Sequence, residues 1–212
     1  MNRGESSNGR GSRTARRERK KGKPLDETSL RDLALSYAAR FATTGAKLEG
    51  YLARKIRERG LAEDADGRSV PIDVPAMVAR LVELGYVNDD AYARMKSRDL
   101  TARGYGTRRV DQALYAAGVE ENVRAAHAPG EFASREAAAL LARKRRFGPY
   151  SPSEKTGSQP VDVHKLREKQ VAAMLRAGHR FDHVRFVIDA ADATIIEEWI
   201  EEARDGGDDD AY

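Results

Sequence analysis

Apolar residues recur at helical spacing along most of the chain. From residue 30 onward the apolar positions follow the i, i+3, i+4, i+7 pattern of one helix face, and they are Leu30, Leu33, Ala34, Tyr37, Ala38 and Phe41. A second run begins after a capping Thr43 or Thr44, stops at Gly60 and carries Leu48, Tyr51, Leu52 and Ile56. A third run has Pro75 in its first turn, ends at Gly85 and is expected to bury Met77, Val78, Leu81 and Val82. Alternating strand-like segments are almost absent, and "VRFVID" (184–189) also fits a helix. The pattern predicts an all-α protein.

The helical pattern repeats. A helix-ending glycine follows an apolar residue by four positions three times, at nearly constant spacing, in the pairs Ile56–Gly60, Leu114–Gly118 and Met174–Gly178. Each pair lies between other short helical segments, so the unit is three helices, and units this small must share their apolar faces with neighbours. We expect three-helix repeats at 28–86, 87–130 and 131–203, tails at 1–27 and 204–212, and inserts at 62–73 and 148–162.

Composition narrows the class of protein. Charged residues make up 34% of the 212 residues and aromatic residues only 7%, so the core is expected to be thin and spread over amphipathic helices. The chain has no cysteine, which excludes disulfides, cysteine-bound zinc and thiol nucleophiles. No segment approaches the ~20 apolar residues of a membrane span, and the N-terminus lacks the apolar stretch of a signal peptide. We expect a cytoplasmic protein without a membrane partner, and a monomer.

Charge is unevenly distributed. Residues 1–24 hold nine Lys or Arg against two acids, whereas residues 197–212 hold eight acids and one arginine. The basic tail is rich in Gly, Ser and Asn and has no apolar periodicity, so we expect it to be disordered. It could attract phosphates or could only aid solubility, and both interpretations stay open.

The segment "RGYGTRRVDQALYAAGV" (103–119) is the most distinctive. On a helical wheel its core face consists of Val110, Ala113, Leu114 and Ala117, whereas Arg108, Gln112 and Tyr115 point away and Arg109 lies to one side. Gly104 and Gly106 permit a tight turn, and Thr107 is the expected N-cap. Because cations oppose the dipole at a helix start, the two arginines indicate an acidic partner or a phosphate. A simple solvated face is the alternative.

A second basic cluster lies at 142–148 and contains Arg143, Lys144, Arg145 and Arg146. The end of a helix favours cations, so helix stabilisation explains these residues well and the cluster is secondary as a binding site. A third group, "LARKIRER" (52–59), would extend the basic surface along a curved array of repeats.

Other chemistry finds little support. His179 and His183 have the i, i+4 spacing of a metal-binding pair, but the HExxH glutamate and any cysteine ligands are missing. Asp89 and Asp90 diverge on a helix and fit a cap and a first turn better than a nuclease pair. No phosphate-binding GxxxxGK[ST] motif occurs. We therefore expect no catalytic, cofactor or metal site, and no enzyme.

The segment 83–119 resembles the RecX family of bacterial regulatory proteins. The resemblance lies in Gly85-Tyr86, in Asp89-Asp90 with Tyr92, and in Arg103-Gly104-Tyr105-Gly106 followed by Arg108-Arg109. By organisation it extends over roughly residues 30–190, and it departs from the family pattern in the two inserts and the charged tails. It implies tandem three-helix repeats in an elongated, curved molecule that binds the RecA–DNA filament and restrains the recombinase, ATPase and coprotease activities of RecA.

The partner contacts that we predict lie in the two basic clusters, and they are Arg103, Tyr105, Arg108, Arg109, Gln112, Tyr115, Arg143, Lys144 and Arg145. Direct contact with DNA through basic residues is left open. Two alternatives remain at this point: a direct DNA-binding protein that uses its basic tail and patches, and a helical scaffold for another protein partner.

Overall fold

The computed structural model describes residues 22–152 and 160–205. Within these ranges the chain forms ten α-helices and one 3₁₀ turn, with two isolated β-bridges and no named strand. The prediction of an all-α protein is confirmed. The helices are α1 (Glu27–Arg40), α2 (Gly45–Arg59), α3 (Val74–Glu83), α4 (Asp89–Ala102), α5 (Thr107–Tyr115), α6 (Glu121–Ala126), α7 (Glu131–Arg145), α8 (Pro160–Arg176), α9 (Phe181–Asp189) and α10 (Ala193–Asp205), and the 3₁₀ turn is η1 (Gly148–Tyr150).

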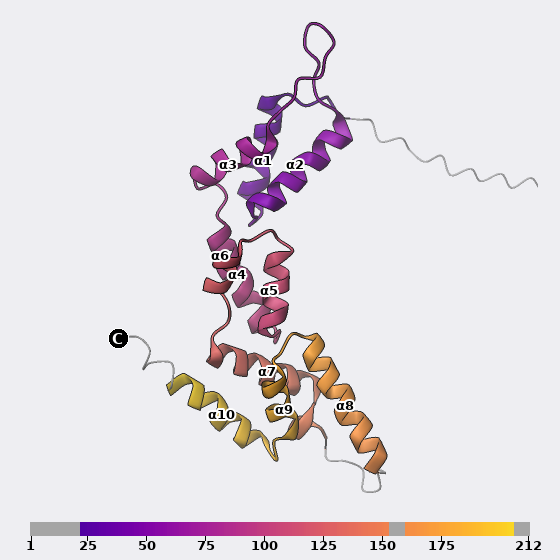
Figure 1. The fold of residues 1–212 in the computed structure, drawn as a ribbon, viewed down its shortest axis with the longest axis vertical. Helices are drawn as coiled ribbons and strands as arrows, with labels where there is room; N and C mark the ends of the chain where they lie inside the picture. Colours follow the sequence, from indigo (N-terminus) through magenta and orange to yellow (C-terminus); the bar gives the residue numbers. More distant parts are fainter. Residues whose placement is uncertain (1–21, 153–159, 206–212) are drawn as a thin grey trace, which may run out of the picture.

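The buried apolar side chains of the described residues form three clusters. The first joins α1, α2 and α3, the second joins α4, α5 and α6, and the third joins α7 to α10. The clusters follow one another along the long axis of a molecule that bends toward the side of α2, α5 and α8 (Figure 1). The third cluster draws on four α-helices, one more than the repeat expected from the sequence.

The first cluster begins earlier in the chain than expected. Leu25 is buried, and its backbone pairs with Leu61 in an isolated bridge, so the predicted tail at 1–27 is wrong at its inner end. Asp26 caps α1 by accepting a hydrogen bond from the Ser29 amide at 2.8 Å. Phe41 and Val82, both expected in the core, are 53% and 42% exposed.

These two errors have different causes. Phe41 is the C-cap of α1, where the chain leaves the helix and the helical spacing no longer applies. Val82 lies on α3, which packs mainly against α2, so its buried face is narrower than its apolar stripe. The cap at Thr44 and the helix end at Gly60 are as predicted.

The insert at 62–73 projects from the end of the molecule as a turn between α2 and α3 (Figure 1). An antiparallel bridge between Glu63 and Ser69 closes it. The Asp64 carboxylate accepts hydrogen bonds from the amides of Asp66 and Arg68, both at 2.9 Å. The insert therefore extends the first unit without interrupting its core. Three predicted segments lie partly outside the described residues. The parts outside are 1–21 of the basic tail, 153–159 of the loop and 206–212 of the acidic tail.

The helices α2, α5 and α8 run head to tail along the inner side of the bend (Figure 1). At the first joint the Thr44 hydroxyl at the start of α2 donates a hydrogen bond to the carbonyl of Ala117 at the end of α5, and the Gly45 amide donates to Asp89 at 2.9 Å. At the second joint the amides of Gly106 and Arg108, at the start of α5, donate to carbonyls at the end of α8. Each helix end thus satisfies groups that the next helix start leaves unpaired.

Candidate functional site

The Gly-Tyr-Gly loop is a structural joint between the second and third clusters. Its Gly106 amide donates to the Ala177 carbonyl at 3.0 Å, and the Arg108 amide donates to the Gly178 carbonyl at 3.2 Å. A Cβ placed on Gly106 would collide with the backbone of Gly178. Gly106, and not Thr107, is the N-cap of α5. Glycine has no side chain to cap the helix, and carbonyls at the end of α8 accept hydrogen bonds from the amides of Gly106 and Arg108 instead. The N-cap predicted at Thr107 is therefore wrong.

His179 closes the same joint from the other side. It is buried, and its Nε2 donates a hydrogen bond to the Gly104 carbonyl at 3.1 Å. Burial lowers the pKa of His179 to about 4, and the nearby His183 acts in the same direction. His183 is also buried, bonds Glu131 at 3.1 Å and packs edge-on against Trp199. Both histidines are thus held by packing and hydrogen bonds.

Acid is expected to weaken this joint through His179. The unfolded chain holds His179 near its ordinary pKa of 6.5, so the unfolded state binds the extra proton first. The stability contributed by neutral His179 is complete above pH 6.5 and is lost as pH falls toward 4, by up to about 3 kcal/mol. Urea unfolding at pH 7.0, 5.5 and 4.5 measures this loss. The matched variant His179→Gln, which keeps a donor but cannot titrate, should show a shallower fall, and equal slopes would contradict the assignment.

The structure changes the explanation of Arg108 and Arg109. These residues lie at the start of α5, where the dipole of α5 itself disfavours cations. The end of α8, however, meets this point, and its carbonyls at Ala177 and Gly178 bring the negative pole of a second helix. The inference that local stability cannot account for these arginines is therefore wrong. Both side chains are nevertheless exposed, and neither forms an ion pair within the part of the chain that the structure describes.

The structure brings Arg103, Tyr105 and Lys144 together. Arg103 is the C-cap of α4, and its guanidinium lies 5.6 Å from the ring centroid of Tyr105. The Lys144 ammonium, from the end of α7, lies 3.4 Å from the Arg103 carbonyl. Arg103 also lies 3.6 Å from Asp99. The two basic clusters that the sequence shows separately thus meet at the joint of the second and third units.

Gln112 and Tyr115 lie on the side of α5 that faces α6. Arg108, Gln112 and the α6 residue Arg124 line a groove of about 470 Å³ between α5 and α6. Tyr115 is 71% exposed, and the Arg124 guanidinium stacks 5.3 Å from its ring centroid. Arg124 in turn pairs with Asp111 at 2.8 Å. Of the predicted contacts, Arg108 and Gln112 therefore line this groove, and Tyr115 contacts it only through Arg124.

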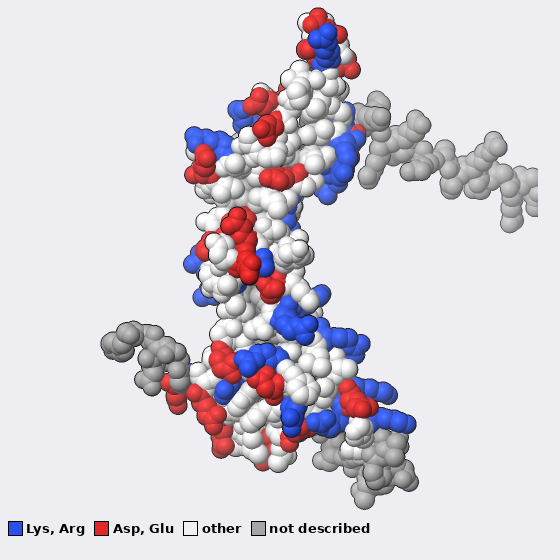
Figure 2. Space-filling model, in the orientation of Figure 1, with Lys and Arg blue, Asp and Glu red and all other residues white. Residues whose placement is uncertain are grey.

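Arg143 and Arg145 are exposed in the last turn of α7, as expected for cations at a helix end. Sequence reasoning missed the exposed cations of α8, which are Lys165, Lys169 and Arg176. They lie outside the basic clusters that the sequence analysis names, but their density on one helix was a usable signal. In Figure 2 blue side chains follow the inner side of the bend along α2, at the meeting of α5 and α8, and along α8, whereas red side chains gather over α4, α6 and α10.

The chain is similar in sequence to a curated protein. The chain is 35% identical over 187 residues to "Regulatory protein RecX" of Myxococcus xanthus (strain DK1622), and the match covers 85% of this chain and 96% of that protein. The chain belongs to the RecX family. A solved RecX structure from Lactobacillus salivarius has the same fold, with a TM-score of 0.55 at 19% identity, and the match covers 81% of this chain and 94% of that one. No family profile matches the chain.

The match to the RecX relative extends over 85% of this chain. It confirms the family resemblance that the residues 83–119 indicated. The relative is named a regulatory protein. The described residues contain no group of three or more His, Cys, Asp or Glu that could hold a metal ion. Among the described helices, none combines the length and the apolar character needed to cross a bilayer.

Proposed function

We propose that this protein binds the RecA–DNA filament and inhibits the recombinase, ATPase and coprotease activities of RecA. The observation that carries the proposal is membership of the RecX family, over nearly the whole length of the relative. The bent shape and the basic inner side support it, because a RecA filament offers both acidic protein surface and DNA phosphate to such a face. The proposal places the protein in the cytoplasm, as a monomer that acts by binding.

The proposed mechanism is bridging. The three units follow one another along the molecule, so successive units can contact successive RecA protomers. The cations at the second joint and along α8 would face the filament, with Arg108, Arg109 and Tyr105 as the first contacts. RecA protomers held in a fixed relation cannot make the movements that accompany ATP turnover. Other proteins that bind the same groove of the RecA filament are also excluded.

Direct DNA binding is the second candidate, and the same basic side favours it. It predicts binding to bare single-stranded DNA that falls steeply with salt, because phosphate contacts release counterions. The filament proposal instead predicts that the protein needs RecA for tight binding. The helical-scaffold alternative predicts no effect on RecA.

The deciding experiment titrates the protein into RecA with single-stranded DNA and follows ATP hydrolysis. We expect inhibition at substoichiometric protein, because one bridging molecule restrains several protomers. Fluorescence anisotropy with the bare oligonucleotide runs in parallel at the same salt. Tight binding to bare DNA without any change of the ATPase rate would transfer the assignment to the nucleic-acid candidate.

A further inference from the structure

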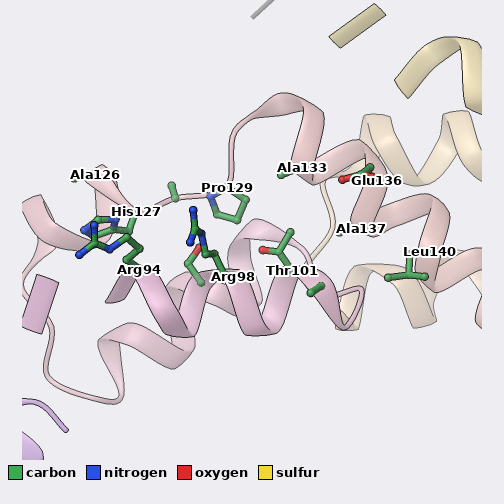
Figure 3. A pocket seen from close by; sticks show the side chains of 13 residues that line it. Arg94, Arg98, Thr101, Ala126, His127, Pro129, Ala133, Glu136, Ala137 and Leu140 are labelled. Atoms are coloured by element: carbon green, nitrogen blue, oxygen red, sulfur yellow. The ribbon is translucent and has the colours of Figure 1, made fainter. Parts of the chain in front are cut away.

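A pocket of about 720 Å³ lies between the second and third clusters, on the side of the molecule opposite α8. Its walls are α4, the linker 126–129 and the first half of α7 (Figure 3). Small side chains make up much of the lining. The charged or titratable groups that line it are Arg94, Arg98, His127 and a single carboxylate, Glu136. The proposed RecA contacts do not use this pocket.

One cation of the pocket, Arg98, is exposed and can receive a carboxylate. Arg94 and His127 are engaged with Asp90, at 3.8 and 2.6 Å, whereas Arg98 forms no ion pair with any described residue. The hydroxyl of Thr101, next along the same face of α4, is buried and has no hydrogen-bond partner among the described residues. The two side chains lie beside each other in the pocket (Figure 3). An exposed guanidinium suits a carboxylate.

The end of α10 lies close to this pocket. The Arg204 guanidinium stacks 4.7 Å from the ring centroid of Phe132, and Ala133, the next residue of α7, lines the pocket. In Figure 1 the end of α10 and the linker before α7 lie on the same side of the molecule. After Asp205 the sequence continues Gly-Gly-Asp-Asp-Asp. An extended chain covers about 3.4 Å per residue, so a segment of this length can reach at most roughly 10–17 Å from Asp205 at the three aspartates.

We propose that residues 208–210 of this chain dock in the pocket, with a carboxylate on the exposed Arg98. The docked segment ties α10, which belongs to the third cluster, to α4, which belongs to the second. It braces the second joint on the side opposite the contact between α5 and α8. Release of the segment leaves that joint held by the Gly106–Gly178 contact and by His179.

The test uses the full chain, which has no cysteine of its own. Asp209→Cys and Ala128→Cys are introduced together, because Ala128 is exposed at the pocket. Disulfide formation under mild oxidation is then followed by gel mobility. Docking predicts fast closure within one chain, slowed about tenfold by Arg98→Gln and by raised salt. The control Arg68→Gln removes an equal charge from the distant insert and should leave the closure rate unchanged. Circular dichroism of the helical signal checks that each variant is folded.

Three outcomes overturn the proposal. Equal rates of disulfide closure with and without Arg98 would show that the segment meets the pocket only by random encounter. No closure would show that the segment stays elsewhere. Disulfides that join two chains would assign the pocket to the acidic segment of a second copy. Because no RecA is present, failure here leaves the proposed function unaffected.

Discussion

The double reversal Arg108→Glu/Arg109→Glu is expected to remove most of the inhibition of RecA, raising the concentration for half-inhibition at least tenfold, or about 1.4 kcal/mol. Both side chains are exposed and neither has a described ion-pair partner, so the change alters the surface more than the core. Reversal replaces attraction to acidic surface or phosphate by repulsion. The measurement is the DNA-dependent ATPase rate of RecA against added variant.

The matched control is Arg68→Glu/Arg80→Glu, which makes the same change of net charge in the first unit. Both residues are exposed, and Arg80 gives up only a surface ion pair with Glu83. We expect this control to inhibit nearly as well as the parent chain. Unchanged inhibition by the folded Arg108/Arg109 variant would remove these two residues from the contact surface.

Gly106→Ala is expected to be the most damaging single substitution at the joint. The backbone at Gly106 has an ordinary φ of −81°, so an alanine meets no conformational obstacle there. The obstacle is steric, because the new Cβ would collide with the carbonyl group of Gly178 and the amide of His179, which cannot swing aside as a side chain could. We expect a loss of about 3 kcal/mol in the free energy of unfolding and a changed angle between the second and third units.

Urea unfolding and small-angle scattering measure these two effects. Gly50→Ala is the control: this glycine lies inside α2 with open space around its Cβ position, so alanine should stabilise the chain by about 1 kcal/mol. If the two alanine variants had the same stability, the close approach at Gly106 would not be a constraint in solution.

Local pattern was enough for most of the helices. Caps such as Thr44 and helix ends such as Gly60 depend on groups within one turn, and sequence shows those groups directly. The cap at Gly106 could not be found in this way, because its acceptors belong to residues 177 and 178, far along the chain. The same contact reverses the dipole argument about Arg108. Leu25 was assigned to the tail because its partner, Leu61, lies beyond two whole helices, α1 and α2.

The candidate site was predicted in parts. The Gly-Tyr-Gly signature identified the segment and its family, but a helical wheel describes one helix alone. It therefore grouped Tyr115 with Arg108, although Tyr115 stacks on Arg124 of α6. The meeting of Lys144 with Arg103 depends on how α7 crosses the end of α4, which no periodicity encodes. The cations of α8 were missed although their density on one helix is visible in the sequence.

The head-to-tail order of α8, α5 and α2 gives the molecule a direction. All three helices point the same way along the inner side of the bend, so the two ends of the molecule differ. A polymer of identical protein subunits with a common orientation also has two unlike ends. Such a polymer would bind the molecule in a single orientation. The insert at 62–73 would then always point toward the same end of the polymer. Growth and loss of subunits at the two termini would then be affected unequally.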